Sequence, residues 1–182
     1  AAAARGDIAI LVNNAGGVES GPFADTTRET WERLIALNLT ATFEGCQAVI
    51  AGMAARKYGR IVNIASTAGL KGYRYVAAYC AAKHGVVGLT RALAHEYART
   101  GVTVNAVCPG YTETELVAQS VQQVAAKTGK SADEIRAQYA RANPMGRLMT
   151  PAEVADAVLY LCRSGAGAMT GQSIAVAGGE IM

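Results

Sequence analysis

The chain has 182 residues, a mass of 18.8 kDa and a formal net charge of +3. This length predicts one domain, which buries roughly 70% of the unfolded surface and so has a substantial core. With 51% hydrophobic and 17% charged residues, the composition excludes a disordered chain. The basic residues form no block, which argues against a nucleic-acid partner. No apolar run approaches the roughly 18 residues of a membrane span, so we expect no membrane partner.

The sequence starts with AAAARGDIAILVNNAG, which has no initiator Met, and its apolar run at 8–12 is too short for a signal peptide. We interpret the first residues as the tail of a helix that enters a strand, so the sequence is expected to begin inside a domain. The cysteines are widely spaced and form no C-x-x-C pair: Cys46, Cys80, Cys108 and Cys162. This spacing predicts reduced thiols in a cytoplasmic protein and no metal site.

Short segments rich in β-branched residues predict four strands, at 8–12, 60–65, 102–107 and 172–176. Their nearly continuous apolar content is typical of a parallel sheet covered on both faces. Longer helical stretches separate them, and strand–helix–strand repetition gives right-handed crossovers. The sequence therefore predicts an α/β fold with a Rossmann-like, doubly wound parallel sheet.

Helix starts are marked by capping-box patterns at 26–29, 131–134 and 150–153. The last pattern is the best of the three because Pro151 occupies the first helical position. A long helix is expected over 76–100, ended by Gly101. Trp31 and Phe43 stand at helical spacing and are expected in the core.

The polar stretch 113–143 predicts two helices joined around Gly129 and Lys130. It is either a surface excursion or a lid over a site at the carboxyl ends of the strands. Its place directly after the third strand favours the lid.

Three small or polar turns follow the first three strands: NNAGG at 13–17, STAG at 66–69 and PGYTET at 109–114. The ligand of an open parallel sheet lies beyond the carboxyl ends of the strands, so these turns are expected at one edge. Each turn taken alone is an ordinary strand-to-helix connection.

Tyr79 and Lys83 are four residues apart and share one face of the long helix. An adjacent ammonium is expected to lower the pKa of a tyrosine, which makes Tyr79 a candidate general acid/base. The Y-x-x-x-K spacing is weak evidence alone. Ser66 ends the second strand, where its hydroxyl can bond a substrate oxygen. Asn38 interrupts a helical segment and is either a kink or part of a proton relay.

Taken together, NNAG at 13–16, Asn38, Ser66, YCAAK at 79–83 and the Pro109–Gly110 pair resemble the short-chain dehydrogenase/reductase family over the whole chain. The stretch 60–114 is similar to β-ketoacyl reductases, aromatic-polyketide ketoreductases and 3-hydroxyacyl-CoA dehydrogenases. The resemblance implies an oxidoreductase that uses NADP or NAD to interconvert a ketone and a secondary alcohol. A 3-oxoacyl or 3-hydroxyacyl thioester is the expected substrate.

The resemblance also implies roles for single residues. Tyr79 exchanges the proton with the substrate oxygen, Ser66 steadies that oxygen, and Lys83 also holds the nicotinamide ribose. Asn38 supports a water chain from Lys83. Residues after the first strand line the adenosine side of the cofactor: Asn13, Ala15 and Gly16. Residues after the third strand position the nicotinamide carboxamide: Pro109, Gly110, Thr112 and Thr114. The family more often has Val or Ile where Thr112 stands, which leaves a backbone contact possible.

One departure from the family pattern is large. The glycine-rich turn that grips the pyrophosphate has no counterpart, nor has the residue that selects NAD or NADP. The sequence thus resembles the carboxyl-terminal part of a single domain, 1–182, with strands 4-5-6-7 of the family order and without the first βαβαβ portion. In that order the segment 8–12 becomes an unpaired apolar edge.

Two alternatives stay open at this stage: a dehydrogenase of a small alcohol, sugar or steroid, and an inactive truncated fragment that serves only in assembly. The family resemblance further implies a two-fold symmetric homo-oligomer, expected to be a tetramer. Its interface is expected to use the helices after Thr27 and after Val76, together with the tail 171–182.

Overall fold

The computed structural model describes residues 6–181. The expected helix tail at 1–5 and the last residue of the predicted interface tail lie outside the described residues. The strands are β1 (Ile10–Asn13), β2 (Gly59–Ile64), β3 (Val102–Pro109) and β4 (Ser173–Val176). They form one parallel sheet in the order β1-β2-β3-β4. The four predicted strands and their parallel arrangement are confirmed, with ends shifted by one or two residues.

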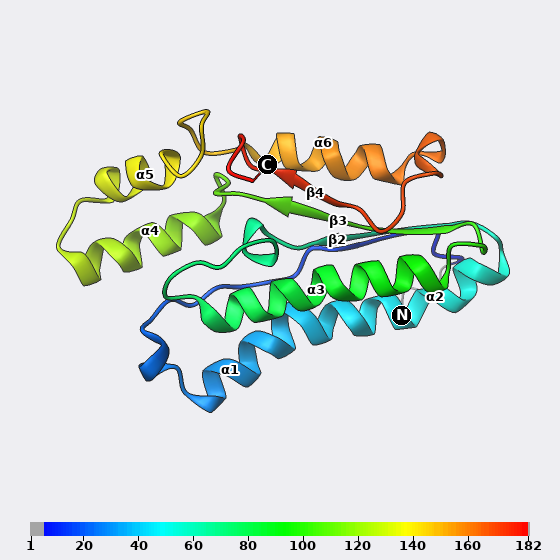
Figure 1. Cartoon of the computed structure of the whole chain (residues 1–182), viewed down its shortest axis with the longest axis horizontal. Coiled ribbons are helices and arrows are strands. Elements are labelled where there is room, and N and C mark those ends of the chain that lie inside the picture. The colour runs from blue at the N-terminus through cyan, green and yellow to red at the C-terminus, as the bar shows by residue number, and fades with distance from the viewer. Residues whose placement is uncertain (1–5, 182) are drawn as a thin grey trace.

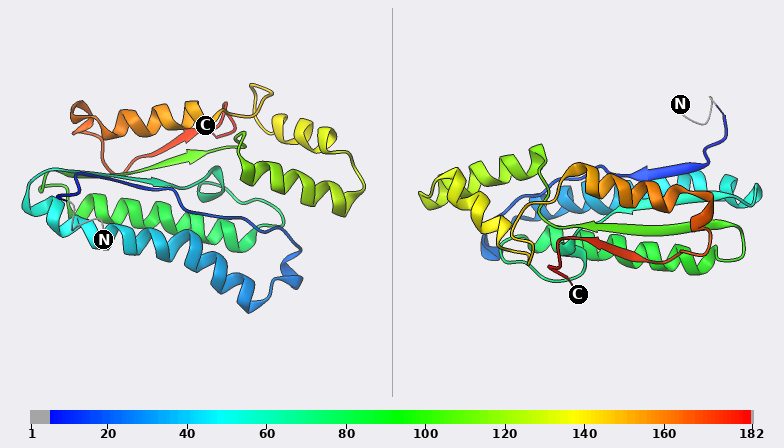
Figure 2. Two further views of the ribbon diagram at one scale, coloured as in Figure 1. Left: turned by 180° about the vertical axis from the view of Figure 1, so that it is seen from behind. Right: turned by 90° about the horizontal axis from the view of Figure 1, so that it is seen from above.

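Helices cover both faces of this sheet. They are α1 (Arg28–Ile35), α2 (Ala41–Ala55), α3 (Ala77–Glu96), α4 (Glu115–Thr128), α5 (Ala132–Ala140) and α6 (Pro151–Cys162). The helices α2 and α3 lie side by side on one face and α6 lies on the other, while α4 and α5 project beyond the end of the sheet (Figure 1). The views from behind and from above show the same three layers (Figure 2). The doubly wound α/β architecture is therefore confirmed.

Alternation along the two central strands divides the core between the two faces. In β2, Ile61 packs with Met53 of α2, whereas Val62 packs with Leu161 of α6. Each of these four side chains is at most 1% exposed. Because both faces of β2 and β3 are buried, their sequences show no polar alternation, as expected for the centre of a parallel sheet.

Two of the three predicted capping boxes are confirmed. Ser131 and Thr150 each accept a hydrogen bond from the third helical N–H, and Glu134 and Glu153 bond back to the cap. The box predicted at 26–29 is wrong. Thr27 caps α1 by accepting from the N–H of Thr30, so the helix starts one residue later and Glu29 cannot close the box.

The helices α1 and α2 are continuous through a π-helical turn, Ala36–Thr40. The resulting helix, Arg28–Ala55, has 28 residues and is long and apolar enough to span a membrane. Core helices of globular domains can have the same length and composition. In this structure Val49 and Ile50 of the helix Arg28–Ala55 pack on the sheet beside α3.

The expectation that Trp31 and Phe43 belong to the core is wrong. They are 40% and 44% exposed, because they lie on the outer faces of α1 and α2, which no other described element covers. The predicted apolar edge is present: Ile10 and Val12 of β1 are 46% and 41% exposed, while Leu11 between them packs against the core on the other face.

The long helix ends at Glu96, four residues before the predicted end, and Gly101 closes the turn that leads into β3. Gly101 has a φ of +80°, and a Cβ there would overlap the backbone carbonyl of Lys57. Both the left-handed backbone and the close approach require glycine at this position.

We expect Gly101→Ala to lower the free energy of unfolding by more than about 2 kcal/mol, since strain and backbone overlap act together. Gly165→Ala is the control, because a Cβ at Gly165 meets no atom within 4 Å. Urea denaturation of the two variants measures the difference. Equal stabilities would contradict this account of the turn.

Candidate active site

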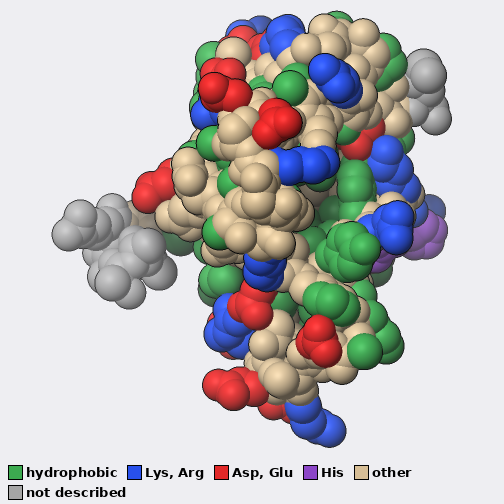
Figure 3. All heavy atoms as spheres, turned by 90° about the vertical axis from the view of Figure 1, so that its left-hand side faces the viewer, with side chains coloured by type: hydrophobic (Ala, Val, Ile, Leu, Met, Phe, Trp, Pro, Cys, Tyr) green, Lys and Arg blue, Asp and Glu red, His purple; other side chains and the backbone are tan. Residues whose placement is uncertain are grey.

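The predicted site residues gather at the carboxyl edge of the sheet. The strands β1, β2 and β3 end at Asn13, Ile64 and Pro109, and the turns after them lie at the end of the molecule that carries α4 and α5 (Figure 1). Seen from that end, Lys or Arg and Asp or Glu side chains are interspersed without a continuous patch of one sign (Figure 3).

The structure brings the Ser66 and Tyr79 hydroxyls together. Ser66 begins the turn Thr67–Gly69, and its Oγ accepts a hydrogen bond from the N–H of Ala68 at 3.1 Å. Tyr79 lies in the first turn of α3, and burial raises the pKa of its phenol, while a hydrogen bond with Ser66 acts in the opposite direction. At neutral pH Tyr79 is therefore protonated and able to donate.

Lys83 lies one helical turn beyond Tyr79 and is 4% exposed. Its Nζ donates to the carbonyl oxygen of Ile64 at 2.8 Å and lies 5.7 Å from the centroid of the Tyr79 ring. Burial lowers the pKa of Lys83 to about 8. The expectation of a lowered pKa for Tyr79 is wrong for this state of the protein, because desolvation by burial outweighs the hydrogen bond with Ser66, which lowers the pKa.

Asn38 is fully buried in the π-helical turn, so the predicted interruption of the helix is confirmed. Its side chain bonds both backbone groups of Gly17: Nδ2 donates to the carbonyl at 2.9 Å and Oδ1 accepts from the N–H at 3.1 Å. A Cβ on Gly16 would lie 2.9 Å from Asn38 Oδ1 and 3.5 Å from Lys83 Nζ. Asn38 thus holds the turn after β1 against Lys83, and its part in a water chain remains a prediction.

The side chain of Asn13 points into the protein. Its Nδ2 donates to Asn63 Oδ1 at 2.8 Å, and Asn63 Nδ2 donates to Thr90 Oγ1 at 3.0 Å. This internal role engages the amide nitrogen of Asn13, which favours its backbone for contact with a ligand. Sequence reasoning missed Asn63, although a polar residue inside an apolar strand was a signal of an internal network.

The turn after β3 is held by a backbone bond to β4 and by its own threonine side chains. Gly110 N–H donates to the carbonyl of Val176 at 3.0 Å, and the Thr112 hydroxyl donates to the carbonyl of Gly110 at 3.0 Å. Thr114 caps α4 by accepting from the N–H of Val117. Thr112 also forms a bridge with Met149, so the two ends of the polar stretch lie together. The four predicted residues of this turn therefore share one rigid corner.

The polar stretch 113–143 forms the two predicted helices, α4 and α5. Gly129 ends α4 with a φ of +70°, as the predicted junction requires. Tyr139 of α5 stacks on Tyr111 with ring centroids 4.1 Å apart, and its hydroxyl is 2.9 Å from that of Ser120. Aromatic stacking thus ties the helical pair to the turn after β3.

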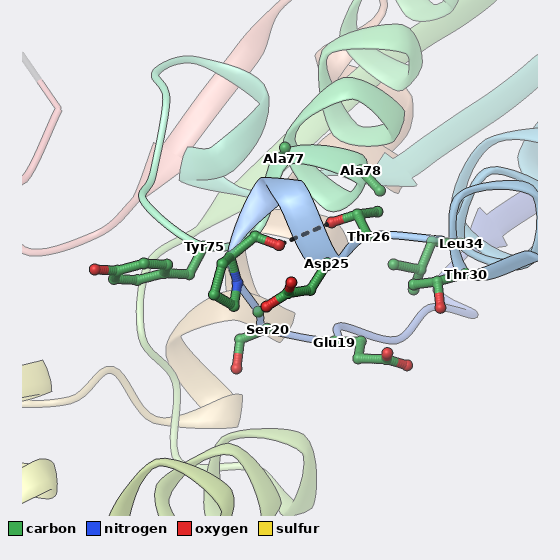
Figure 4. Close-up of a pocket in the computed structure, with 11 residues that line it drawn as sticks. Glu19, Ser20, Asp25, Thr26, Thr30, Leu34, Tyr75, Ala77 and Ala78 are labelled. Carbon is green, nitrogen blue, oxygen red and sulfur yellow. Dashed lines mark hydrogen bonds between the residues drawn. The ribbon is translucent and has the colours of Figure 1, made fainter. Parts of the chain in front are cut away.

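Two hollows lie along the carboxyl edge. One is formed by residues 12–15 of the β1 end with Ala41 and Thr42, so it contains two residues predicted to line the cofactor. The other lies between the segment after β1 and the start of α3, and Glu19, Asp25 and Tyr75 are among its lining residues (Figure 4). It contains none of the predicted catalytic residues.

The residues at this edge fit part of a dinucleotide. Asn13 and Ala15 line the first hollow. The absence of a Cβ at Gly16 lets the turn after β1 lie against Asn38 Oδ1 and close to the buried amine of Lys83. The turn that would grip the pyrophosphate has no counterpart in this sequence. Within residues 6–181, no three His, Cys, Asp or Glu side chains are placed to hold a metal ion. The four cysteines are free thiols.

Comparison with known proteins agrees with this geometry. The family model described as Enoyl-(Acyl carrier protein) reductase matches residues 1–180. A Streptomyces virginiae protein whose name assigns it to ketoacyl reduction in the monensin polyketide synthase is 46% identical over 176 residues, 96% of this chain and 67% of that protein. The acetoacetyl-CoA reductase of Rhizobium meliloti is 42% identical over 96% of this chain and 68% of its own length.

Among solved structures, a variant of actinorhodin polyketide ketoreductase determined with NADPH superposes with a TM-score of 0.91 and 44% identity. The match covers 95% of this chain and 67% of that one. The chain thus spans about two thirds of the length of the relatives that it matches. With the family model matched along nearly all of its residues, the chain belongs to the short-chain dehydrogenase/reductase family of NAD(P)-dependent oxidoreductases.

Proposed function

We propose that the protein reduces a 3-oxoacyl thioester, or a related ketone, to the secondary alcohol with NADPH or NADH. The observation that carries this proposal is the meeting of the Ser66 and Tyr79 hydroxyls beside the buried amine of Lys83. Two hydroxyl donors at one point suit a carbonyl oxygen that gains negative charge during reduction. The intact set of Ser66, Tyr79, Lys83 and Asn38 argues against a degenerate site, whereas the missing pyrophosphate turn argues that these 182 residues alone are inactive.

In this mechanism the nicotinamide supplies the hydride. Ser66 donates a hydrogen bond to the substrate oxygen, and Tyr79 passes its phenolic proton to the same oxygen as the alcohol forms. Lys83, one helical turn beyond Tyr79, would hold the ribose hydroxyls of the bound cofactor. Asn38 keeps the turn at Gly16 and Gly17 against Lys83, and so keeps the cofactor side of the site in place. A protonated Tyr79 holds the proton that the reduction consumes.

The cofactor contacts proposed at the β1 end are backbone contacts of Asn13, Ala15 and Gly16, since the Asn13 side chain is engaged with Asn63. At the β3 end we assign the carboxamide to the corner that holds Pro109 and Gly110, and the cap residues Thr112 and Thr114 fix that corner. The pair α4 and α5, in the stretch 113–143, serves as the substrate lid. It projects over the same edge of the sheet (Figure 1).

We also propose a two-fold symmetric homotetramer in the cytoplasm. The outer faces of α2 and α3 are rich in small exposed residues, such as Ala48, Ala51, Ala81 and Gly88, which allow close helix approach. The accessible surface of 9959 Å² is about a fifth above that expected for a compact monomer of this mass. Exposed apolar side chains contribute to this surplus, and subunit contacts would cover them.

Tyr79→Phe in the full-length protein is expected to lower kcat by about 100-fold or more, because the ring is kept and only the transferred proton is lost. Tyr160→Phe is the control, since Tyr160 lies half exposed on α6, away from the carboxyl edge. Steady-state reduction of acetoacetyl-CoA with NADPH measures both. Near-normal turnover of the first variant would remove Tyr79 from the mechanism.

Because the pKa of Lys83 is lowered in the folded protein, we expect the stability of the cofactor-free protein to depend on pH. The pKa of Lys83 is about 8 in the folded protein and ordinarily 10.5, so between these pH values the unfolded chain binds a proton that the folded chain has released. The contribution of Lys83 to the free energy of unfolding therefore rises as the pH increases from about 8 to 10.5. Below pH 8 the buried ammonium is charged in both states, and its full desolvation penalty lowers the stability of the folded protein. Lys83→Met should flatten this rise in urea denaturation, and an unchanged pH slope would contradict the assignment.

Assembly gives a third test. Phe43 is 44% exposed on the face of α2 that we assign to the interface, so Phe43→Arg should dissociate the tetramer. Phe23, which is 74% exposed outside the proposed interface helices, provides the control variant Phe23→Arg. Sedimentation velocity at micromolar concentration distinguishes the species. A monomeric parent protein would overturn the proposed assembly.

A further inference from the structure

Glu180 is a buried carboxylate that the proposed mechanism does not use. Its side chain is only 2% exposed, and Oε1 lies 3.1 Å from Nζ of Lys71. Oε1 also accepts a hydrogen bond from the Tyr73 hydroxyl, whereas Oε2 is buried without a hydrogen-bond partner. Burial of a carboxylate carries a desolvation cost that its contacts with Lys71 and Tyr73 must offset, so this position is not ordinary packing.

The contacts of Glu180 continue to the turn that carries Ser66. The Tyr73 and Thr67 hydroxyl oxygens are 2.7 Å apart. A phenol has one proton and a carboxylate only accepts, so Tyr73 donates to Glu180 and accepts from Thr67. The direction of the Thr67 contact agrees with its effect on the pKa of Tyr73, which it lowers against the larger rise caused by burial and by Glu180.

Thr67 fixes the turn through its backbone as well. Its carbonyl accepts from the N–H groups of Leu70 and Lys71, at 2.9 and 3.0 Å. Lys71 therefore contacts both ends of the hydrogen-bonded chain, through its backbone at Thr67 and through its ammonium at Glu180. A closed ring of bonds links the residue next to Ser66 with the carboxylate.

On its other side, Glu180 packs against the turn after β3. Its N–H donates to the carbonyl of Ala177 at 3.1 Å, and a Cβ on Gly110 would lie 3.0 Å from Oε2. The charge of Glu180 also contributes to raising the pKa of Tyr111 to about 12, behind the larger effects of burial and Tyr139. The carboxylate thus stands between the turn of Ser66 and the corner at Gly110.

We infer that Glu180 is a positioning residue: through Tyr73 and Thr67 it fixes the turn that presents the Ser66 hydroxyl to the substrate oxygen. This inference rests on the proposed reduction of a ketone. A hydroxyl that stabilises developing charge acts best when it is held within about 0.5 Å of its place, and hydrogen bonds to the supporting residues add to packing in holding it there. The buried acceptor Glu180 supplies such a restraint.

The first test is kinetic and uses the full-length protein with NADPH and acetoacetyl-CoA. Glu180→Leu removes the acceptor and should lower kcat about tenfold or more, with KM and the Kd of NADPH within about threefold of the parent. Tyr73→Phe should act in the same direction. Glu180→Gln keeps an acceptor oxygen for Tyr73 and should recover most of kcat. Glu32→Gln, from the exposed Arg28–Glu32 pair, is the matched control for loss of a carboxylate.

The second test needs no turnover and follows amide hydrogen exchange. The N–H groups of Gly69, Leu70 and Lys71 are bonded within the turn, and exchange over 66–71 should accelerate about tenfold or more in Glu180→Leu and Tyr73→Phe. Exchange in β3 should not change. Tyr73→Phe and Glu180→Gln carry both tests if Glu180→Leu does not fold.

Each outcome of these two tests either supports or overturns the inference about Glu180. Unchanged hydrogen exchange over 66–71 overturns the inference. Faster exchange with normal kcat also overturns it, because the contacts of Glu180 then stabilise the turn without affecting catalysis. A loss confined to NADPH affinity also overturns it and assigns Glu180 to the corner at Gly110. If the parent protein reduces no ketone while exchange still responds to Glu180→Leu, the proposed function fails and the tie between Glu180 and the turn stands.

Discussion

The buried side chain of Asn63 is the interaction on which the arrangement of the site depends. Its Oδ1 accepts from Asn13 of the neighbouring strand and from the Cys46 thiol of α2, and its Nδ2 donates to Thr90 of α3. One amide in β2 therefore connects a second strand and both helices on the same face. Since a buried amide without partners is costly, these elements are held in a single register relative to one another.

The positions of the candidate catalytic side chains follow from this arrangement of strands and helices. The strand that contains Asn63 ends at Ile64, two residues before Ser66, and the helix that contains Thr90 carries Tyr79 and Lys83. The Lys83 amine completes the link by donating to the carbonyl of Ile64. The proposed reacting groups are thus placed by buried polar bonds between elements, and burial is also the largest cause of the pKa shifts of Tyr79 and Lys83.

Much of this arrangement could be predicted from the sequence. The strands β2 and β3 can be predicted because they are buried on both faces and their sequences are continuous apolar runs. The helix starts at Ser131 and Thr150 can be predicted because a capping box involves only four consecutive residues. Trp31 was misplaced because helical periodicity shows which residues share a face, and not whether anything covers that face. Sequence patterns report neighbours along an element better than partners across the fold.

The same limit explains what was missed in the site. The Ser66, Tyr79 and Lys83 set was found through a family resemblance, whereas the direction of the Tyr79 pKa shift depends on desolvation that only the folded structure reveals. Glu180 lies more than 100 residues from Tyr73 in the sequence, and its role depends on that contact. An isolated acidic residue after two glycines was the only signal.

The bridge between Thr112 and Met149 has an evolutionary consequence. The chain leaves the sheet region and returns to it at hydrogen-bonded neighbours, since Glu113 N–H donates to the Met149 carbonyl and Met149 N–H to that of Tyr111. Insertions or deletions between these anchors change the closure entropy only slowly with length. Changes in the length of the helical pair α4 and α5 are therefore compatible with an unchanged sheet, and the proposed catalytic groups keep their places when the proposed lid varies.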